Sequence, residues 1–294
     1  MNVGYDIVIV GAGIVGAACA DACAAGGLKV LVLERSCVGG GTTAAGMGHV
    51  VVMDDSPAQL ALTNYSCQLW REMAAAGMPA TTEYDPCGTL WVAADDEEMA
   101  EVHRKKKICD EHGVAAEVWD GAQLARGEPK LRKGLAGALR VTGDGVIYPP
   151  TAAAFLLERA RAKGAELRLG VPVKRLPVDG GVELENGQRI ECRIAVNAAG
   201  PWAGGLGVTA VIKKRKGHLV ITDRYPGYVH HQIVELGYLK SAHSVSSDSV
   251  AFNIQPRKTG QMLIGSSRQY DAEGMEVDTK ILARMIKRAQ EYLP

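Results

Sequence analysis

The sequence predicts an α/β protein whose first domain is built on a parallel sheet, and three observations near the start of the chain lead to this fold class. Tyr5–Val10 is a short, β-branched apolar run, which is typical of a strand buried on both faces. It leads directly into the glycine-rich turn Gly11–Gly16 and then into the alanine-rich stretch Ala17–Ala25, which favours a helix. A second apolar run, Lys29–Glu34, follows a Gly-Gly pair and ends on an acid. This order of strand, turn, helix and strand is that of a parallel α/β unit.

The glycines and the acid predict that this unit binds a dinucleotide. Gly11 permits a tight turn, Gly13 lets the backbone approach a pyrophosphate, and Gly16 lets the helix pack closely on the strand. The helix N-terminus directs N–H groups and a partial positive charge at the phosphates. Glu34, 18 residues after Gly16, can hydrogen-bond a ribose diol. Its charge disfavours the 2′-phosphate of NADP, which leaves NAD and FAD open.

Two later segments favour FAD. Gly39–His49 is rich in small residues and hydroxyls and has no periodicity of helix or strand. Such a loop suits close packing against a large planar cofactor, and the alternative is a flexible surface linker. Ile194–Ala198 is a strand end, and the following Ala-Gly lets the chain turn against a ligand at the carboxyl edge of the sheet.

The segment between these two predicts a second α/β crossover. A helix pattern runs from Tyr148 to Arg161 and is capped by Gly164. Glu166–Leu169 and Val171–Leu176 follow as strands, which we expect to join the same sheet.

With these segments in view, the chain resembles the D-amino acid oxidase (DAO) superfamily of flavoproteins, in its glycine oxidase and bacterial D-amino acid dehydrogenase branch. The matching pieces follow the family's order along nearly the whole chain: Gly11–Gly16, Glu34, Gly40–Gly48, Gly170–Val173, Val196–Trp202, Lys216–His218, Pro256–Gly260 and Leu263–Ser267. Three segments further resemble the bacterial D-hydroxyproline dehydrogenase type: Thr43–Val52, Gly217–Pro226 and Gly265–Tyr270.

The resemblance implies an FAD-binding, Rossmann-like domain of the GR2 type and a discontinuous substrate domain built on an antiparallel sheet. The expected FAD-binding domain comprises residues 1–85 and 146–214, and the substrate domain comprises residues 86–145 and 215–268. Residues 269–294 are expected to form a helix that leads toward a further FAD-domain segment, which this chain lacks because it stops at Pro294. In the family that segment carries an arginine that binds the substrate carboxylate.

The resemblance also implies non-covalent FAD extended across the sheet edge, since no cysteine lies in a covalent-flavin motif. Glu34 and Arg35 are expected at the adenosine, and the backbone of Val173 at the adenine. The predicted cofactor contacts are Gly11, Gly13, Ile14, Val15, Gly16, Glu34, Arg35, Thr42, Thr43, Ala45, Gly46, Met47, Gly48, Val173, Ala198, Ala199, Gly200 and Trp202.

The function that the resemblance implies is oxidation of the C–N bond of a small amino acid, with a hydride passing from the α-carbon to flavin N5 and leaving an imine. The substrate is expected to be D-hydroxyproline or a related D- or secondary amino acid, and the alternative within the enzymes is glycine or sarcosine. The rival from another class is a catalytically incompetent FAD-binding subunit or truncated fragment, because the carboxylate-binding segment is missing. An NAD-dependent dehydrogenase remains a further alternative.

Five residues are candidates for the catalytic or substrate-binding site. Met47 and His49 belong to the flavin loop, where His49 either touches the substrate or hydrogen-bonds the backbone. Asn253 and Gln255 alternate along a strand and therefore share one face. The family commonly has a tyrosine at the position of Asn253, so the pocket chemistry differs there. Tyr238 lies in a loop-like stretch, together with His243, that either covers the site or lies at the surface.

Composition and charge favour a small-molecule enzyme over a nucleic-acid or membrane protein. Lys+Arg and Asp+Glu both count 33, which gives no electrostatic reason to expect nucleic acid or an anionic membrane. The run Arg104–Lys107 follows Asp95–Glu98 at helical spacing, as on a solvated face with ion pairs. No metal is predicted, because His230 and His231 are adjacent in a strand and no Cys-x-x-Cys pair occurs.

The expected location is the cytoplasm, peripherally at the inner membrane if a partner holds the chain there. The apolar run Ile7–Cys19 is too short to span a membrane and has no basic segment before it, so neither a transmembrane segment nor a signal peptide is predicted. The expected partners are an amino-acid substrate and, in an oligomer, further copies of the chain. A quinone or a partner subunit is a candidate electron acceptor, and the sequence leaves oxygen open as the third.

Overall fold

The computed structural model describes residues 4–207, 211–237, 248–270, 272 and 274–294, and it divides into two compact units. The first unit comprises residues 1–46, 79–82 and 148–213, and the second comprises residues 47–78, 83–147 and 214–294. Both units are discontinuous in sequence. Residues 47–78 group with the second unit, whereas the boundary expected from the sequence lies at residue 85.

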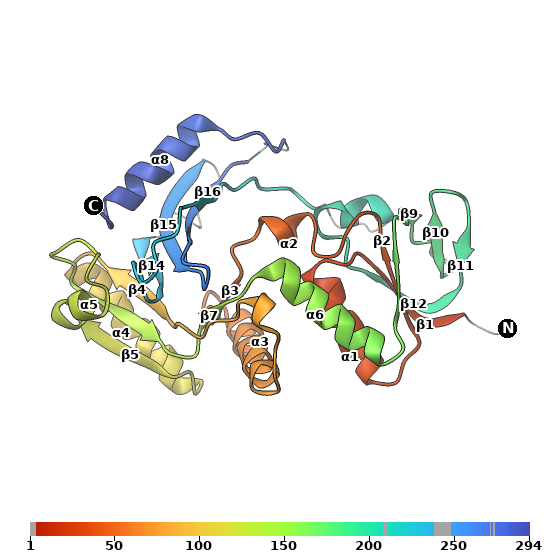
Figure 1. Cartoon of the computed structure of the whole chain (residues 1–294), viewed down its shortest axis with the longest axis horizontal. Coiled ribbons are helices and arrows are strands. Elements are labelled where there is room, and N and C mark those ends of the chain that lie inside the picture. Colours follow the sequence, from red (N-terminus) through yellow and green to blue (C-terminus); the bar gives the residue numbers. More distant parts are fainter. Residues whose placement is uncertain (1–3, 208–210, 238–247, 271, 273) are drawn as a thin grey trace. The chain divides into compact units, whose positions relative to one another are not determined.

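The first unit contains a four-stranded parallel sheet with the order β12-β1-β2-β8 (Figure 1). Its strands are β1 (Tyr5–Val10), β2 (Val30–Glu34), β8 (Glu166–Leu169) and β12 (Cys192–Asn197). Val8, Ile9 and Leu31 are fully buried, as expected for β-branched and aliphatic residues in a sheet covered on both faces. The predicted strands of the first 34 residues are confirmed to within one residue at each end.

Two helices of the first unit pack against each other, α1 (Ile14–Ala25) and α6 (Pro149–Ala162). The α1 helix begins after Gly13 and consists largely of small residues, which allows a close approach to its neighbour. The buried Asp21 on α1 accepts hydrogen bonds from Arg159 (3.0 Å) and Lys163 (2.8 Å). These two bonds fix α6 against the helix that follows the glycine turn.

The expected strand Val171–Leu176 does not join the parallel sheet, so that prediction was wrong. Prolines at positions 172 and 177 limit the strand to β9 (Val173–Arg175). It pairs instead with β10 (Val182–Leu184), which pairs with β11 (Arg189–Ile190), in a separate antiparallel sheet. Two 3-10 turns, Ala80–Thr82 and Gly200–Leu206, and the short helix α2 (Thr42–Ala45) complete the described part of the unit. The α2 helix lies in the stretch where no helical periodicity was expected.

The second unit is built on a seven-stranded sheet with the order β13-β16-β15-β14-β4-β6-β5 (Figure 1). Its strands are β4 (Thr89–Ala93), β5 (Ala116–Asp120), β6 (Gly137–Val141), β13 (Val220–Ile221), β14 (Gln232–Glu235), β15 (Ser249–Pro256) and β16 (Met262–Arg268). Neighbouring strands are antiparallel except for β14 and β4, which run parallel. This sheet joins the two segments that were expected from the sequence to form one substrate domain.

Helices of the second unit begin at residues that cap them. They are α3 (Pro57–Ala75), α4 (Asp96–Glu111), α5 (Gly121–Gly127) and α8 (Thr279–Gln290). The unit also has a small two-stranded antiparallel sheet, in which β3 (His49–Val50) pairs with β7 (Gly145–Val146). The Asp95 side chain accepts the Glu98 N–H at the start of α4, and Asp120 and Gln123 form a capping box on α5. On α4, Lys106 and Lys107 pair with acids one turn further on, as expected for a solvated face.

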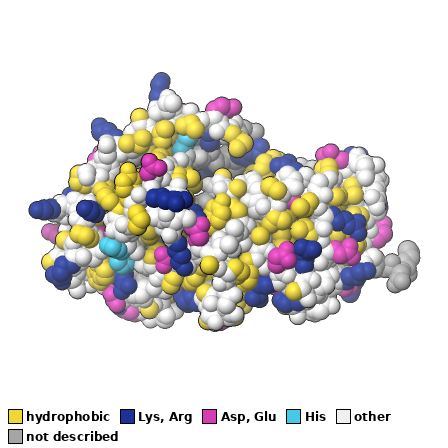
Figure 2. Space-filling model, viewed as in Figure 1, with side chains coloured by type: hydrophobic (Ala, Val, Ile, Leu, Met, Phe, Trp, Pro, Cys, Tyr) yellow, Lys and Arg dark blue, Asp and Glu magenta, His cyan; other side chains and the backbone are white. Residues whose placement is uncertain are grey.

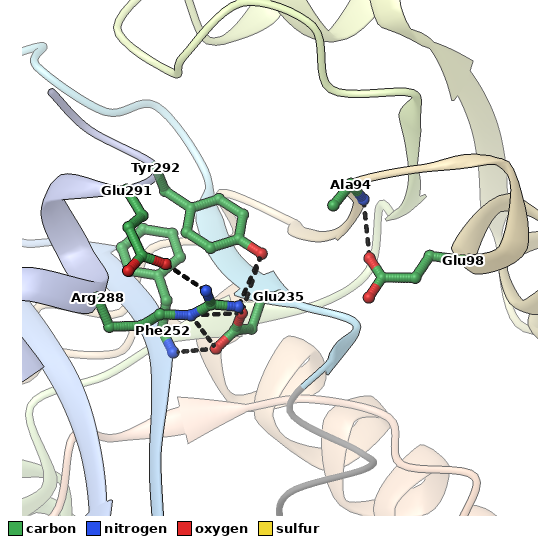
Figure 3. A network of polar contacts seen from close by, with 7 residues as sticks. All are labelled: Ala94, Glu98, Glu235, Phe252, Arg288, Glu291 and Tyr292. Atoms are coloured by element: carbon green, nitrogen blue, oxygen red, sulfur yellow. Dashed lines mark hydrogen bonds and ion pairs between the residues drawn. The ribbon is translucent and has the colours of Figure 1, made fainter.

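A buried carboxylate fixes α8 to the sheet (Figure 3). Glu235 is 2% exposed and accepts hydrogen bonds from the Arg288 guanidinium, the Tyr292 hydroxyl (2.9 Å) and the Phe252 N–H (2.5 Å). The Phe252 and Tyr292 rings stack with their centroids 4.7 Å apart. The helix is therefore held both by apolar packing and by a satisfied buried charge.

Charged side chains of both signs are interspersed over the face shown in Figure 2. This distribution accords with the zero formal net charge of the sequence. No helix among the described residues is both long enough and apolar enough to cross a membrane.

Candidate cofactor and substrate sites

The glycine turn after β1 is packed too tightly for side chains. Gly11 has a φ of +107°, and a Cβ there would lie 2.5 Å from the Ala198 carbonyl oxygen at the end of β12. A Cβ on Gly16 would lie 1.9 Å from the Gly11 carbonyl oxygen. The first turn of α1 thus lies directly on the loop, which is the close helix-to-strand packing expected of the third glycine.

The N-terminus of α1 is contacted by the loop that contains α2. The Ile14 N–H donates to the Thr43 hydroxyl at 3.0 Å, and a Cβ on Gly13 would lie 3.0 Å from the same oxygen. The Thr43 hydroxyl still has a hydrogen to donate. It therefore lies beside the positive end of the helix, where phosphate oxygens bind in dinucleotide sites.

Glu34 is held at the end of β2 by two bonds to the main chain. One carboxylate oxygen accepts the Ala12 N–H of the glycine turn at 2.8 Å, and the other accepts the Ser36 N–H at 2.9 Å. The Ser36 hydroxyl also donates to the second oxygen at 3.2 Å, whereas the oxygen bound to Ala12 has a further lone pair, with which the fixed side chain can still accept a hydrogen bond from a ribose hydroxyl. The acid and the turn are thereby joined into one rigid group.

These residues line a pocket of about 380 Å³ within the first unit. The predicted cofactor residues that line it are Gly11, Gly13, Ile14, Val15, Glu34, Arg35, Thr42, Thr43, Val173, Ala198, Ala199, Gly200 and Trp202. Gly16, Ala45 and Gly46 are not in its lining, and Met47 and Gly48 belong to the second unit. Gly16 acts instead beneath the turn, by permitting the close packing described above.

Several lining residues were not predicted from the sequence: Ser36, Gly40, Gly41, Val171, Pro172, Glu185, Pro201 and Leu206. Ser36 and Gly41 adjoin predicted residues, so sequence proximity was a usable signal for them. Glu185 follows β10 and donates its N–H to the Pro172 carbonyl at 3.1 Å. Its place depends on the separate antiparallel sheet, which was not predicted from the sequence.

Arg35 and Trp202 form one wall of the pocket. The Arg35 guanidinium carbon lies 4.0 Å from the centroid of the Trp202 ring, which is within range of a cation–π interaction. Gly41 has a φ of +58°, and a Cβ there would lie 3.2 Å from the indole ring. This wall therefore combines the flat ring of Trp202 with the positive charge of Arg35.

The residues present fit the adenosine diphosphate half of FAD. The cradle of glycines and the helix N-terminus suit the pyrophosphate, and the fixed carboxylate of Glu34 suits the ribose. The volume is within the range of about 300–1,000 Å³ that is usual for cofactor sites.

In the second unit, two of the predicted substrate residues contact Met47. Gln255 donates from its Nε2 to the Met47 carbonyl oxygen at 2.6 Å. Asn253 lies beside the Met47 sulfur, since a Cβ on Gly265 would lie 2.5 Å from Asn253 Oδ1 and 2.8 Å from Met47 Sδ. Asn253 Nδ2 donates to the Ser266 hydroxyl at 3.2 Å, and its Oδ1 is buried without a hydrogen-bond partner among the described residues. Both side chains face the same way, as the alternation predicted.

His49 is bound by a side chain and not by the backbone. Its Nδ1 hydrogen-bonds the Gln232 Oε1, and Gln232 Nε2 donates to the Thr89 hydroxyl at 2.9 Å. The His49 residue is exposed to solvent, but its ring is surrounded by protein atoms. Desolvation of the ring lowers the pKa of His49, and the hydrogen bond to Gln232 opposes this effect. Gln232 and Thr89 were not predicted, and their only signal was a polar residue in an otherwise apolar strand. Tyr238, the remaining candidate, and His243 lie outside the described residues.

Asp144 lies fully buried behind Thr89. It accepts the Val52 N–H at 3.0 Å. Burial raises the pKa of the Asp144 carboxyl to about 7, against the opposing effects of the Thr89 hydroxyl, the Val52 N–H and the charge of Arg71. Asp144 is therefore a carboxyl that changes charge near neutral pH inside the protein.

We expect the stability of the protein to fall as the pH rises from about 4 to about 7. The folded protein keeps the Asp144 proton up to about pH 7, whereas an unfolded chain releases it near ~3.9, so unfolding releases a proton in this window. The contribution is on the order of 4 kcal/mol and levels off above pH 7. Urea denaturation at a series of pH values should show this slope, and Asp144→Asn should remove it. The exposed Asp55→Asn should retain the slope, and an equal slope in both variants would contradict the assignment.

The neighbouring His230 and His231 contact a buried acid. Glu128, which is fully buried, accepts from the backbone N–H groups of both residues at 2.9 and 2.8 Å and from His231 Nδ1 at 2.7 Å. No group of three or more His, Cys, Asp or Glu side chains in the described ranges is placed to hold a metal ion.

Several known proteins are similar to this chain in sequence. The chain is 29% identical over 279 residues to the hydrogen cyanide synthase subunit HcnC of Pseudomonas aeruginosa, covering 77% of this chain and 66% of that protein. It is 28% identical over 233 residues to a subunit of the anaerobic glycerol-3-phosphate dehydrogenase of Escherichia coli, covering 74% of this chain and 42% of that protein. Glycine oxidase of Geobacillus kaustophilus is 27% identical over 217 residues, and the match covers 69% of this chain and 56% of that protein. The chain thus matches between 42% and 66% of the length of these relatives.

Solved structures share the fold. Glycine oxidase from Bacillus cereus superposes with a TM-score of 0.84 at 20% identity, covering 99% of this chain and 80% of that one. L-proline dehydrogenase from P. horikoshii superposes with a TM-score of 0.86 at 22% identity, covering 100% of this chain and 78% of that one. Residues 6–294 match the profile of the family described as DAO, FAD dependent oxidoreductase. The chain therefore belongs to the DAO family of FAD-dependent oxidoreductases.

Proposed function

We propose that this chain binds FAD non-covalently in the pocket of the first unit and oxidises the C–N bond of a small amino acid. The observation that carries the proposal is the rigid group formed by the glycine turn, the N-terminus of α1 and the fixed carboxylate of Glu34. Membership of the FAD-dependent family supports the cofactor. When bound, FAD supplies a two-electron oxidant, and the protein supplies binding, orientation and exclusion of water.

We propose D-hydroxyproline or a related D- or secondary amino acid as the substrate. One relative, 29% identical over 213 residues, is 4-methylaminobutanoate oxidase of Paenarthrobacter nicotinovorans, whose name gives a secondary amine as its substrate. Another is glycine oxidase, whose name gives a small amino acid. Among the predicted substrate residues that the structure describes, the polar atoms without a hydrogen-bond partner include the buried Oδ1 of Asn253 and the outer nitrogen of His49. Both can accept a hydrogen bond, which suits the N–H groups of an amine.

Reduction of bound flavin by amino acids tests the function directly. The purified chain should show absorption near ~450 nm from oxidised flavin, and D-hydroxyproline or D-proline should bleach it without oxygen. Glycine and sarcosine test the alternative substrates in the same assay. A flavin-containing protein that none of these amino acids bleaches would be the FAD-binding subunit without activity. A colourless protein that FAD does not bind would overturn the proposal.

We further propose that a partner subunit or a quinone accepts the electrons. Two of the relatives are named as subunits, which supports an acceptor on another chain. The reduced protein should reoxidise slowly with oxygen and rapidly with an artificial quinone, as followed by the return of the flavin absorption. Rapid reoxidation by oxygen alone would indicate an oxidase.

Replacing Glu34 with glutamine is expected to weaken FAD binding at least about tenfold. The substitution removes the charge that strengthens hydrogen bonds to the ribose, and such charged bonds contribute about 1.5–3 kcal/mol. Titration of the apoprotein with FAD, followed by quenching of flavin fluorescence, measures the effect. Glu158→Gln is the matched control, because Glu158 is an exposed residue of α6 that pairs with Arg161, and it should leave the affinity unchanged.

A further inference from the structure

The pocket of the first unit continues beyond Glu34, on the side away from the glycine turn. In the parallel sheet β1 leads into the glycine turn, its neighbour β2 ends on Glu34, and β8 pairs with the far side of β2. The chain that leaves β8 stays at this edge, because the Val171 N–H donates to the Glu34 carbonyl at 3.0 Å. Residues 171–173 therefore follow the carboxylate that suits the ribose, and all three line the pocket.

Glu185 is held at this end of the pocket by its main chain. The strand β10 pairs antiparallel with β9, with Leu184 opposite Val173, and the Glu185 N–H donates to the Pro172 carbonyl at 3.1 Å. Val171, Pro172 and Val173 are apolar members of the lining here, and Glu185 is a charged one. This end of the pocket thus combines apolar surface with a carboxylate.

The carboxylate of Glu185 is available to a ligand. The lining has three charged residues, of which Glu34 accepts two main-chain N–H groups and Arg35 lies over the Trp202 ring. Glu185 is exposed, and among the described residues its carboxylate has neither an ion pair nor a hydrogen bond. The two cations of β9 do not neutralise it, because both pair with Glu183.

A carboxylate in this place can distinguish one purine from another. A carboxylate only accepts hydrogen bonds. Adenine presents an amino group, which donates, at the edge where guanine presents a carbonyl oxygen, which only accepts. Hypoxanthine, the deaminated form of adenine, has an oxygen at the same place. The acid therefore attracts adenine and repels the two oxygen-bearing bases, and both effects add to the selectivity.

We propose that Glu185 is a specificity-determining residue that accepts a hydrogen bond from the exocyclic amino group of adenine in FAD. This role rests on the proposed binding of FAD in this pocket, with the pyrophosphate on the glycine turn and the ribose at Glu34. The base then lies beyond Glu34, where residues 171–173 offer apolar contacts to its ring and Glu185 offers an acceptor to its polar edge.

Competition between two bases tests this role without any catalysed reaction. The full chain is freed of flavin and titrated with FAD and with flavin hypoxanthine dinucleotide, in which an oxygen replaces the amino group of adenine. Quenching of flavin fluorescence measures both affinities. The wild type should bind FAD about tenfold more tightly than the analogue. ADP and IDP carry the same two bases without the flavin, and ADP should displace bound FAD more effectively than IDP does.

Two substitutions of Glu185 are expected to change this preference in different ways. Glu185→Ala should lower the affinity for FAD about 3- to 10-fold without weakening the analogue, so that the preference falls to about threefold or less. Glu185→Gln keeps the shape, and its amide can present either its oxygen or its NH₂ group to the base. This variant should therefore bind the analogue more tightly than the wild type does.

Glu191→Ala is the matched control. Glu191 is an exposed acid of the same unit that pairs with Arg189 and lies outside the lining of the pocket. Its removal should leave the tenfold preference in place. Because Glu185 and Glu191 are both exposed, both alanine variants should unfold at the same urea concentration as the wild type within error.

Each result of these titrations decides a different point. If the wild type binds the two dinucleotides equally, or if the preference survives in Glu185→Ala, the role of Glu185 is excluded while FAD binding stands. If neither FAD nor ADP binds, the proposed cofactor pocket fails and the role of Glu185 fails with it. If FAD binds with the expected preference but no amino acid reduces it, the proposed activity fails and the role of Glu185 stands.

Discussion

Replacing Gly16 with alanine is expected to abolish FAD binding and to lower the free energy of unfolding by about 3 kcal/mol. The new methyl group would lie 1.9 Å from the Gly11 carbonyl oxygen, which is backbone and cannot rotate away. Either α1 or the turn must move, and each carries part of the phosphate cradle. Urea denaturation measures the first effect, and titration with FAD measures the second.

The control is another glycine of the first unit. A Cβ on Gly205 would meet no atom within 4 Å, so Gly205→Ala should change stability by less than about 0.5 kcal/mol and leave FAD affinity intact. If Gly16→Ala bound FAD as tightly as this control does, the close packing of helix on turn would not be what shapes the site.

Replacing Glu235 with alanine is expected to lower the free energy of unfolding by about 3–5 kcal/mol. The substitution leaves the Arg288 guanidinium, the Tyr292 hydroxyl and the Phe252 N–H without their shared acceptor, and the acceptor lies in the interior (Figure 3). A buried polar group that has lost its partner destabilises the folded state by its full desolvation penalty. This penalty is larger than the net contribution of one satisfied hydrogen bond to stability. Thermal and urea unfolding followed by circular dichroism should show the loss.

The matched control removes the other acid that pairs with the same arginine. Glu291 binds Arg288 at the exposed end of α8, where its side chain is 47% exposed. Glu291→Ala should therefore destabilise the protein by less than about 1 kcal/mol. Similar losses in the two variants would indicate that the pairing at Glu235 is no more important than a surface ion pair.

The parts of the fold that follow local patterns could be predicted from the sequence. The β1-α1-β2 unit is specified by apolar runs and glycines within about thirty residues, so its bounds were predicted closely. The prediction for β9 failed although its partner is local: the next strand, β10, pairs with it across a short loop that contains Gly180 and Gly181, and this hairpin signal was overlooked. The helix α3 was missed although Ser56 and Pro57 form a capping signal at its start.

The cofactor pocket was more predictable than the group around His49 for the same reason. Most of the pocket belongs to segments with recognisable glycine and small-residue patterns. Asn253 and Gln255 could be paired because they alternate along a single strand. The contacts of His49 depend on Gln232 and Thr89, which only the parallel pairing of β14 with β4 brings together.

The parallel pairing of β14 with β4 has a consequence for how the chain is made. Thr89 and Gln232 are bonded across 143 residues of intervening sequence, so β4 emerges from the ribosome long before β14 exists. During that interval the antiparallel group β4-β6-β5 presents an open edge of apolar residues, which is a template for intermolecular pairing. Closure of a loop of this size is slow. Nascent chains should therefore depend on chaperones until residue 235 has been translated.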